Sequence, residues 1–236
     1  IKFFLDSIES DDLDRIQSFT QFGQQVFNKI ATSDKKTYAY LDGLALGGGF
    51  ELALACDYRI ATRKTVIAFP ETGIGIYPGL GGTQRTSRLI GEGATKYLVA
   101  TGQFLDAKKA YQFGLVDDVI EPVFTISDLS NYRLEQVQAG MDSQALANVD
   151  FCDFNGDLSA ELFEDAKYQS YEKALAAKAP IALNMAMNLV SEGAKVSLQQ
   201  GLALELAGLK DIFSTKDAKA GLSSILTGKK PEYLGE

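Results

Sequence analysis

The hydrophobic positions near the start of the chain follow the period of a helix. Between Asp11 and Ile30 they recur every three or four residues, at Leu13, Ile16, Phe19, Phe22, Val26, Phe27 and Ile30. This spacing collects the apolar side chains on one face and predicts an amphipathic helix. Residues 36–43, KTYAYLDG, alternate between aromatic and other side chains and end in Asp-Gly, which predicts a strand followed by a turn.

Residues 50–122 change pattern at short intervals. We predict a helix at 50–57, short strands at 58–60 and 65–69, a glycine-rich loop at 70–82, helices at 83–90, 93–102 and 106–114, and a strand at 115–122. Gly102 and Gly114 end two of these helices in the position that favours glycine, and Asp106 is a predicted N-cap. The alternation of strands and helices predicts an α/β fold.

The pattern weakens after Pro122, and we expect irregular or mixed structure from there to about Ser159. The remaining chain is predicted to be helical, in segments 159–179, 181–194, 197–213 and 217–226. We therefore divide the chain into an α/β region, residues 1–122, and a region of irregular structure and C-terminal helices, residues 123–236.

The composition narrows the classes of function. The 236 residues contain 23 Lys and Arg against 31 Asp and Glu, a net charge of −8, and this acidic balance argues against a nucleic-acid-binding protein. Cys56 and Cys152 form neither a disulfide framework nor a metal-binding spacing. No apolar run reaches the ~18 residues of a membrane-spanning helix, and no signal peptide is visible. We expect a reduced, cytoplasmic protein that binds no membrane.

The chain contains no histidine, which excludes several chemistries at once. A Ser-His-Asp or Cys-His nucleophilic site, an imidazole base and a His-ligated metal all require this residue. If the protein is an enzyme, its carboxylates, lysines, tyrosines or backbone groups must carry the reaction.

Three successive glycines, Gly47 to Gly49, stand directly before a predicted helix. They could form only a tight turn, because glycine adopts backbone conformations that other residues avoid. Alternatively, their N–H groups could bind an anion or a developing oxyanion at the start of the helix. The spacing fits neither a P-loop nor a dinucleotide-binding fingerprint, so the oxyanion interpretation is the stronger of the two functional ones.

Two glutamates lie close to these glycines in otherwise apolar surroundings. Glu51 begins a helix with apolar neighbours on all sides, and a buried carboxylate is costly unless it is paired or used. Glu71 follows Pro70 in a loop whose glycines leave the backbone open to a ligand. Each could be a surface or helix-end residue, but together they offer the paired carboxylates that acid–base work on a water molecule needs.

Three longer segments carry a resemblance to a known family. LDGLALGGGFELALACDYRIA at 41–61, FPETGIGIYPGLGGTQR at 69–85 and ATGQFLDAKKAYQFGLVDDVI at 100–120 resemble the enoyl-CoA hydratase/isomerase (crotonase) family. The likeness spans residues 1–122 and returns in the C-terminal helices from about Ala179. It implies a spiral of ββα units with a helical C-terminal region that drives oligomer packing.

The resemblance also implies roles for individual residues. Gly48 resembles one of two backbone N–H donors that hold the thioester oxygen, where a side chain would block the thioester. Glu51 and Glu71 resemble the glutamates that bind the catalytic water, with Glu71 giving a proton to the α-carbon. Gly79 resembles the glycine whose N–H positions that water. The implied partner is an acyl-CoA thioester, which is the substrate, with no cofactor and no metal.

Because both glutamates are present, the resemblance favours syn-hydration of a trans-2-enoyl-CoA to a 3-hydroxyacyl-CoA. Three alternatives remain: another crotonase-type enzyme, such as an enoyl-CoA isomerase or a thioester hydrolase; a non-catalytic RNA-binding protein; and an inactive scaffold fragment. We expect a homo-oligomer built on trimers or a part of a larger multifunctional polypeptide. The acyl chain length cannot be inferred from these motifs.

The start of the chain departs from the family pattern. In the family, the second oxyanion donor precedes a segment that resembles IKFFLDSI, residues 1–8, so we expect the first spiral strands and that donor to belong to a longer polypeptide. Residues 123–178 are longer and less regular than expected of simple family members. Together with the C-terminal helices, they resemble the hydratase part of fused hydratase/3-hydroxyacyl-CoA dehydrogenase proteins, although no dehydrogenase fingerprint occurs in these residues.

Overall fold

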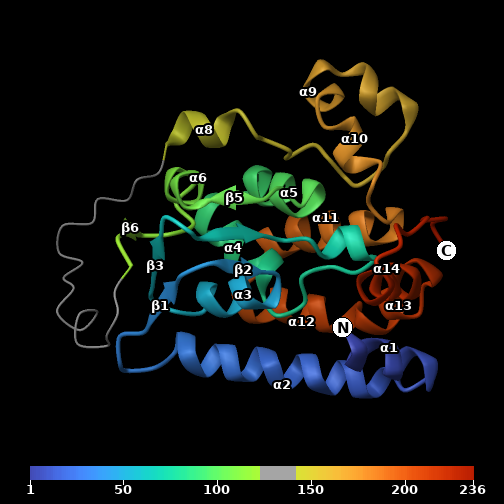
Figure 1. Cartoon of the computed structure of the whole chain (residues 1–236), viewed down its shortest axis with the longest axis horizontal. Coiled ribbons are helices and arrows are strands. Elements are labelled where there is room, and N and C mark those ends of the chain that lie inside the picture. The colour runs from blue at the N-terminus through green and yellow to red at the C-terminus, as the bar shows by residue number, and fades with distance from the viewer. Residues whose placement is uncertain (123–141) are drawn as a thin grey trace.

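The computed structural model describes residues 1–122 and 142–236. Figure 1 shows two small sheets in the middle of the molecule, with α2 along one side and C-terminal helices behind them and at one end. The strands are β1 Tyr38–Leu41, β2 Leu44–Leu46, β3 Tyr58–Thr62, β4 Val66–Ala68, β5 Leu105–Asp106 and β6 Asp118–Ile120. The helices up to β6 are α1 Lys2–Glu9, α2 Leu13–Ala31, α3 Gly48–Leu54, the 3-10 helix η1 Glu71–Ile74, α4 Gly82–Ile90, α5 Glu92–Thr101 and α6 Ala107–Gln112. Those from residue 142 onward are α8 Ser143–Ala147, the 3-10 helix η3 Ala160–Glu164, α9 Ala166–Gln169, α10 Glu172–Leu175, α11 Pro180–Ala194, α12 Leu198–Ala207, α13 Leu209–Phe213 and α14 Lys216–Thr227.

The strands form two three-stranded sheets, in the orders β1-β3-β6 and β2-β4-β5. All pairs in the first sheet are parallel, and β2 pairs with β4 in parallel while β5 is antiparallel to β4. The chain places β1 in the first sheet and β2 in the second, passes through α3, and repeats this order with β3 and β4. This repeated strand-strand-helix order agrees with the predicted α/β spiral. The strand β2 was not predicted, because residues 44–46 are too few to show an alternation.

The predicted amphipathic helix is confirmed as α2, but its buried face differs from the prediction. Ile16 is buried, whereas Phe22 on the predicted apolar face is 66% exposed. The polar residues Thr20 and Gln24 are buried in its place. The physical reason lies in hydrogen bonding, because Gln24 donates to the backbone carbonyl of Gly79 in the 70–82 loop at 2.9 Å.

The predicted helix ends near residues 102–114 are confirmed. Gly102 ends α5 with a positive φ of 62°, and the side chain of Asp106 caps α6 by accepting the Lys109 N–H. Both features follow from local chemistry. A left-handed backbone conformation at the end of a helix favours glycine, and an unpaired N–H group at the start of a helix favours a carboxylate as its acceptor.

The C-terminal helices pack on the α/β region, with α11 against α4 and α5. The side chains of Val99, Ala100, Leu183 and Ala186 are fully buried there. Two predicted helices are broken into shorter ones. Segment 159–179 contains η3, α9 and α10, and segment 197–213 is divided at Gly208, where a side chain would come within 2.9 Å of the Tyr77 hydroxyl.

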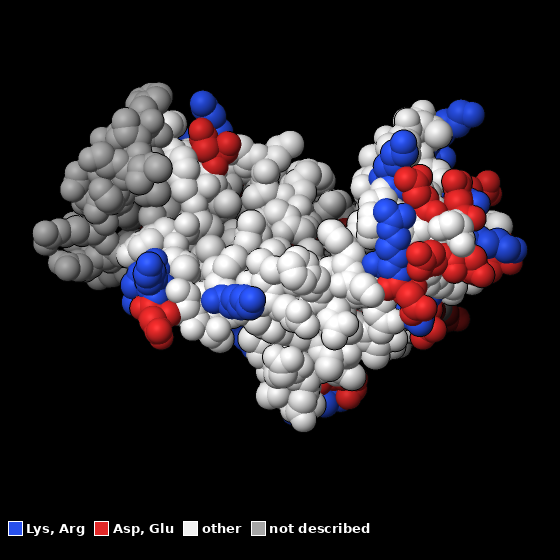
Figure 2. All heavy atoms as spheres, turned by 90° about the horizontal axis from the view of Figure 1, so that it is seen from below, with Lys and Arg blue, Asp and Glu red and all other residues white. Residues whose placement is uncertain are grey.

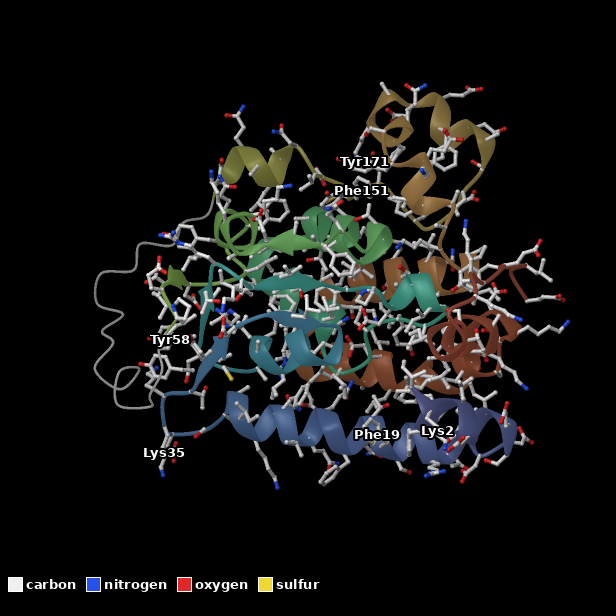
Figure 3. The ribbon with its side chains drawn as sticks, in the orientation of Figure 1. Lys2, Phe19, Lys35, Tyr58, Phe151 and Tyr171 are labelled. Carbon is white, nitrogen blue, oxygen red and sulfur yellow. The ribbon has the colours of Figure 1, made fainter. Side chains whose placement is uncertain are left out.

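Residues 142–179 are held to α5 by an aromatic cluster. The ring of Phe151 contacts those of Tyr97, Phe154, Tyr168 and Tyr171, with centroids 5.0–5.7 Å apart. Figure 3 shows Phe151 and Tyr171 facing each other above the sheets. The irregular structure predicted from residue 123 falls partly on residues 123–141, which lie outside the described residues.

The surface on the side of α2 is poor in charge over its centre. Figure 2 shows Lys, Arg, Asp and Glu gathered most densely at one end, where α1, α14 and the C-terminus lie, with a smaller group toward the opposite end. Lys216 pairs with Glu236 at 3.1 Å at this end. Among residues 1–122 and 142–236, no helix is both long and apolar enough to cross a membrane.

Candidate functional site

The site is built where two neighbouring parallel strands end. Leu46 and Ala68 are partners at the ends of β2 and β4, and the Gly47 N–H continues the pairing to the Ala68 carbonyl at 2.9 Å. Glu51 follows the first strand and Glu71 the second. The carboxyl ends of adjacent parallel strands lie at one edge of a sheet, where ligands of open α/β sheets bind. The strand pairing therefore brings together two glutamates that are 20 residues apart in the sequence (71 − 51).

Gly47 allows Glu71 to approach the start of α3. Its φ of 50° and ψ of −122° are unfavourable for any residue with a side chain. In addition, a Cβ atom at this position would overlap Oε1 of Glu71. At Gly48, where the resemblance implies that a side chain would block the thioester, a Cβ atom would make only an ordinary contact with Leu80, at 3.5 Å. The packing of the protein itself therefore requires glycine at Gly47 and not at Gly48.

The Glu51 carboxylate is held by the loop that leads into α4. Its Oε1 accepts the N–H groups of Leu80 at 2.8 Å and Gly82 at 2.7 Å, and its side chain is buried. Burial raises the pKa of Glu51 to about 7, while the two N–H donors and the charge of Arg85 oppose this rise. Glu51 can therefore exchange a proton near neutral pH.

Glu71 lies in η1, directly after Pro70, and is also buried. Its Oε2 atom has no hydrogen-bond partner in the structure. Burial and the nearby negative charge of Glu51 hold the pKa of Glu71 well above its ordinary value. Because its oxygen accepts fewer hydrogen bonds than that of Glu51, we infer that Glu51 ionises first and Glu71 keeps its proton.

Both glutamates line one cavity of about 190 Å³ together with the two glycines predicted from the sequence, Gly48 and Gly79. The structure thus brings all four predicted site residues together. The other described lining residues are Phe4, Phe19, Thr20, Ile76, Tyr77, Leu80, Leu209 and Phe213, none of which carries a charge. Figure 3 shows Phe19 on α2 close to α1. The cavity combines an apolar wall with two carboxyl groups at one side.

One further glutamate lies behind the loop and was not found from the sequence. Glu205 of α12 is fully buried and accepts the Gly81 N–H at 2.8 Å. Its only sequence signal is an acidic residue among the apolar ones of LALELAG, at 202–208. Because a glutamate at such a position most often faces solvent, this signal is too weak to identify a buried one.

Within the described parts of the chain, no three His, Cys, Asp or Glu side chains are grouped so that they could hold a metal ion. What the site offers is a carboxyl group whose pKa is raised to about 7, a second one whose pKa is held well above its ordinary value, and the apolar cavity that both line. This combination suits the movement of protons to and from an uncharged substrate.

Comparison with known sequences identifies relatives over most of the chain. Residues 1–150 match the profile of the enoyl-CoA hydratase/isomerase family. The short-chain-enoyl-CoA hydratase of Clostridium acetobutylicum is 32% identical over 92% of this chain and 68% of its own length. The methylglutaconyl-CoA hydratase of Mus musculus is 35% identical over 90% of this chain, which spans 57% of the mouse protein.

Solved structures share the fold at lower identity. An enoyl-CoA hydratase from Rhodobacter sphaeroides superposes with a TM-score of 0.79 over 98% of this chain and 73% of its own, at 20% identity. A carnitinyl-CoA dehydratase from Mycobacterium thermoresistibile has a TM-score of 0.77 over 97% of this chain and 71% of its own, at 22% identity. These likenesses confirm the predicted fold class.

Proposed function

The chain belongs to the enoyl-CoA hydratase/isomerase family, and from this premise we propose that it is an enoyl-CoA hydratase, which adds water to a trans-2-enoyl-CoA. The observation that carries the proposal is the pair of buried glutamates, Glu51 and Glu71, in one apolar cavity. A hydratase needs one group that takes a proton from water and another that gives a proton to carbon. The hydrogen bonds of Glu51 favour its ionised form, which suits the first task, and the surroundings of Glu71 favour its protonated form, which suits the second.

In the proposed reaction, Glu51 removes a proton from water as the water oxygen bonds to the β-carbon. The electron pair of the double bond shifts toward the thioester, whose oxygen gains negative charge. Glu71 then gives its proton to the α-carbon, so that H and OH have been added across the double bond. A proton passing from Glu51 to Glu71 restores the starting state. Holding one water between two carboxyl groups contributes to the rate through orientation as well as proton transfer.

The thioester oxygen requires donors that are in place before the reaction. We propose the N–H of Gly48, the first residue of α3, as one donor, and the N–H of Gly79 as the group that positions the water. Both residues line the same cavity as Glu51 and Glu71, which supports these roles.

The cavity favours an uncharged acyl group. Of its described lining residues, only Glu51 and Glu71 are ionisable near neutral pH, and no Lys or Arg is among them. A substrate with a second carboxylate would bring a negative charge toward these glutamates without a cation to balance it. We therefore propose a simple enoyl-CoA as substrate, in preference to a dicarboxylic one of the methylglutaconyl type.

The replacement Glu51→Gln tests the proposal. It keeps the shape of the side chain but removes the base, so we expect hydration of crotonyl-CoA to fall by about 10²- to 10⁴-fold. The loss of ultraviolet absorbance of the conjugated thioester measures the reaction. Glu192→Gln, an exposed residue paired with Lys195, is the control and is expected to keep wild-type activity. Unchanged hydration by the Glu51→Gln variant would remove Glu51 from the mechanism.

An isomerase or thioester hydrolase of the same family remains the alternative reaction. The different proton affinities of the Glu51 and Glu71 carboxyl groups support hydration, because hydration needs both a base and an acid. Isomerisation needs only one group that moves a proton. We also propose that the chain assembles as trimer-based homo-oligomers. Leu204 of α12, an apolar side chain that is 38% exposed, supports association through this helix.

A further inference from the structure

Three successive N–H groups of the loop before α4 are bound by two carboxyl groups. Those of Leu80 and Gly82 donate to Glu51, as described, and that of Gly81 between them donates to Oε2 of Glu205 at 2.8 Å. The backbone strip Leu80–Gly82 therefore lies between Glu51 and Glu205. A change in the orientation of the Gly81 peptide group would also turn its neighbours away from Glu51.

Gln24 of α2 also hydrogen-bonds to this part of the backbone, in addition to Glu51 and Glu205. Its Nε2 donates to the Gly79 carbonyl at 2.9 Å and lies 3.2 Å from Oε2 of Glu205. The Gly79 carbonyl and the Leu80 N–H belong to one peptide group. That group is thus held at its oxygen by Gln24 and at its N–H by Glu51.

Simple packing does not require a carboxyl group at this position of α12. Glu205 is fully buried, makes no ion pair among the described residues and touches the Thr83 hydroxyl at 2.5 Å. Burying a carboxyl group without a cation is costly. An apolar residue would fill the volume more cheaply, but it would leave the Gly81 N–H without its acceptor and would remove one of the three acceptors of the Gln24 amide.

We propose that Glu205 is a positioning residue, which fixes the backbone strip Leu80–Gly82. The N–H groups of Leu80 and Gly82 then hold Glu51 in the orientation that the reaction requires. The inference rests on the hydratase function proposed above. The inference gives α12 a role in the site, although none of the site residues predicted from the sequence lies in this helix.

The groups around Glu205 favour its neutral form at neutral pH. Burial, and then the negative charge of Glu51, raise the pKa of Glu205 to about 8. Arg85 and Arg88 are the cations that act on it from α4, and Tyr77, whose hydroxyl donates to the Glu205 backbone carbonyl, is the remaining ionisable neighbour. The Thr83 hydroxyl donates to Oε1, the Gly81 N–H and the Gln24 amide donate to Oε2, and these three hydrogen bonds oppose the rise of the pKa.

Two replacements distinguish positioning from packing. Glu205→Gln keeps an acceptor oxygen for Gly81 and supplies N–H donors toward Thr83, so kcat at pH 7 is expected within about threefold of wild type. Glu205→Leu keeps the volume but removes the acceptor, and kcat is expected to fall about 10- to 100-fold, the effect of one unsatisfied buried donor. The KM for crotonyl-CoA is expected to change little in both, because Glu205 does not line the cavity.

A matched control separates this effect from a general loss of stability. Asp217 is also a buried carboxylate that accepts two backbone N–H groups, those of Leu234 and Gly235, but it lies in α14 away from the strip. Asp217→Leu is expected to lower the Tm as Glu205→Leu does while kcat stays near wild type. Equal losses of kcat in both variants would overturn the proposal.

A pH series adds a readout that belongs to the Glu205 proton alone. Since its pKa rises from an ordinary 4.5 to about 8 on folding, the folded protein holds a proton that the unfolded chain releases. The wild type therefore loses stability as pH rises through this window, and the glutamine variant lacks this loss. Between pH 5 and pH 8, the Tm of the wild type should therefore fall relative to the Tm of the Glu205→Gln variant.

Amide hydrogen exchange over residues 79–82 tests the inference without activity. Glu205→Leu is expected to raise the exchange rate there by about tenfold or more, and Asp217→Leu to leave it unchanged. If the wild type fails to hydrate crotonyl-CoA but Glu205→Leu loosens this strip, the hydratase proposal fails while the positioning of the strip stands. Unchanged exchange in the Glu205→Leu variant would contradict the inference directly.

Discussion

Glu51 and Glu71 share a cavity but differ in their hydrogen bonds, and in the proposed reaction this difference sets the direction of proton flow at the residue scale. Two backbone N–H groups stabilise the anion of Glu51, whereas Oε2 of Glu71 has no hydrogen-bond partner among the described residues. Two neighbouring carboxyl groups in one apolar site cannot both ionise easily, so the better-solvated one does so first. The first proton is lost from the Glu51 side of the pair.

This order predicts a bell-shaped dependence of kcat/KM on pH. Activity should rise as pH increases through about 7, because Glu51 must lose its proton to act as the base. It should fall again at higher pH, where Glu71, whose pKa lies well above its ordinary value, loses the proton that it must donate. Steady-state rates with crotonyl-CoA measure the profile, and a flat profile below pH 7 would contradict the assignment of the base.

The glycines of the triplet are also predicted to differ. Gly47→Ala should abolish activity and destabilise the fold by about 1–3 kcal/mol, because it combines a strained φ with an overlap on Glu71. Gly49→Ala should leave both nearly unchanged, since a Cβ atom there meets no atom within 4 Å and alanine favours a helix. Thermal unfolding and hydration rates of the two variants provide the comparison, and equal effects would contradict it.

At the scale of single elements, α1 and α13 each contribute an aromatic ring to the cavity wall. The rings of Phe4 and Phe213 stack with centroids 5.1 Å apart, and both line the cavity. In the proposed function, an acyl chain that extends from the thioester into this part of the cavity meets the pair of rings. The cavity, at about 190 Å³, is therefore expected to accept short acyl groups more readily than long ones.

The replacement Phe4→Ala is predicted to shift this preference. Removing the ring opens this part of the cavity, so the ratio of kcat/KM for octenoyl-CoA to that for crotonyl-CoA should rise by about tenfold, the value of a few buried methylene groups. Phe3→Ala is the control, because its ring lies on the same helix but does not line the cavity. An unchanged ratio in Phe4→Ala would show that α1 does not limit chain length.

Elements with local signals were predictable, and those without were not. Asp106 and Gly102 mark their helix ends by chemistry that operates within a few residues, and both predictions were confirmed. The strand at 44–46 is defined by its partner β4 and shows no pattern of its own. The exposed Phe22 and buried Gln24 of α2 could not be assigned from periodicity, because a distant polar network decides which face is buried.

At the scale of the whole molecule, the same division between local and distant causes applies to the site. The resemblance supplied Glu51, Glu71, Gly48 and Gly79, and the structure brings all four to one cavity. It did not supply Glu205, because that residue acts on a strip 124 positions earlier in the sequence. Contacts over such distances depend on how the last helices dock, which no short motif encodes.

The bond between Gln24 and Glu205 joins residues 181 positions apart, and this separation has a consequence for the order of events during synthesis. Domains form as the chain leaves the ribosome, and contacts of such long range close late. A nascent chain that has emerged only as far as α11 carries Glu51 and Glu71 but lacks Glu205, the residue that we propose to hold the Leu80–Gly82 strip. We expect such a chain to be inert, so that activity begins only when α12 has been released.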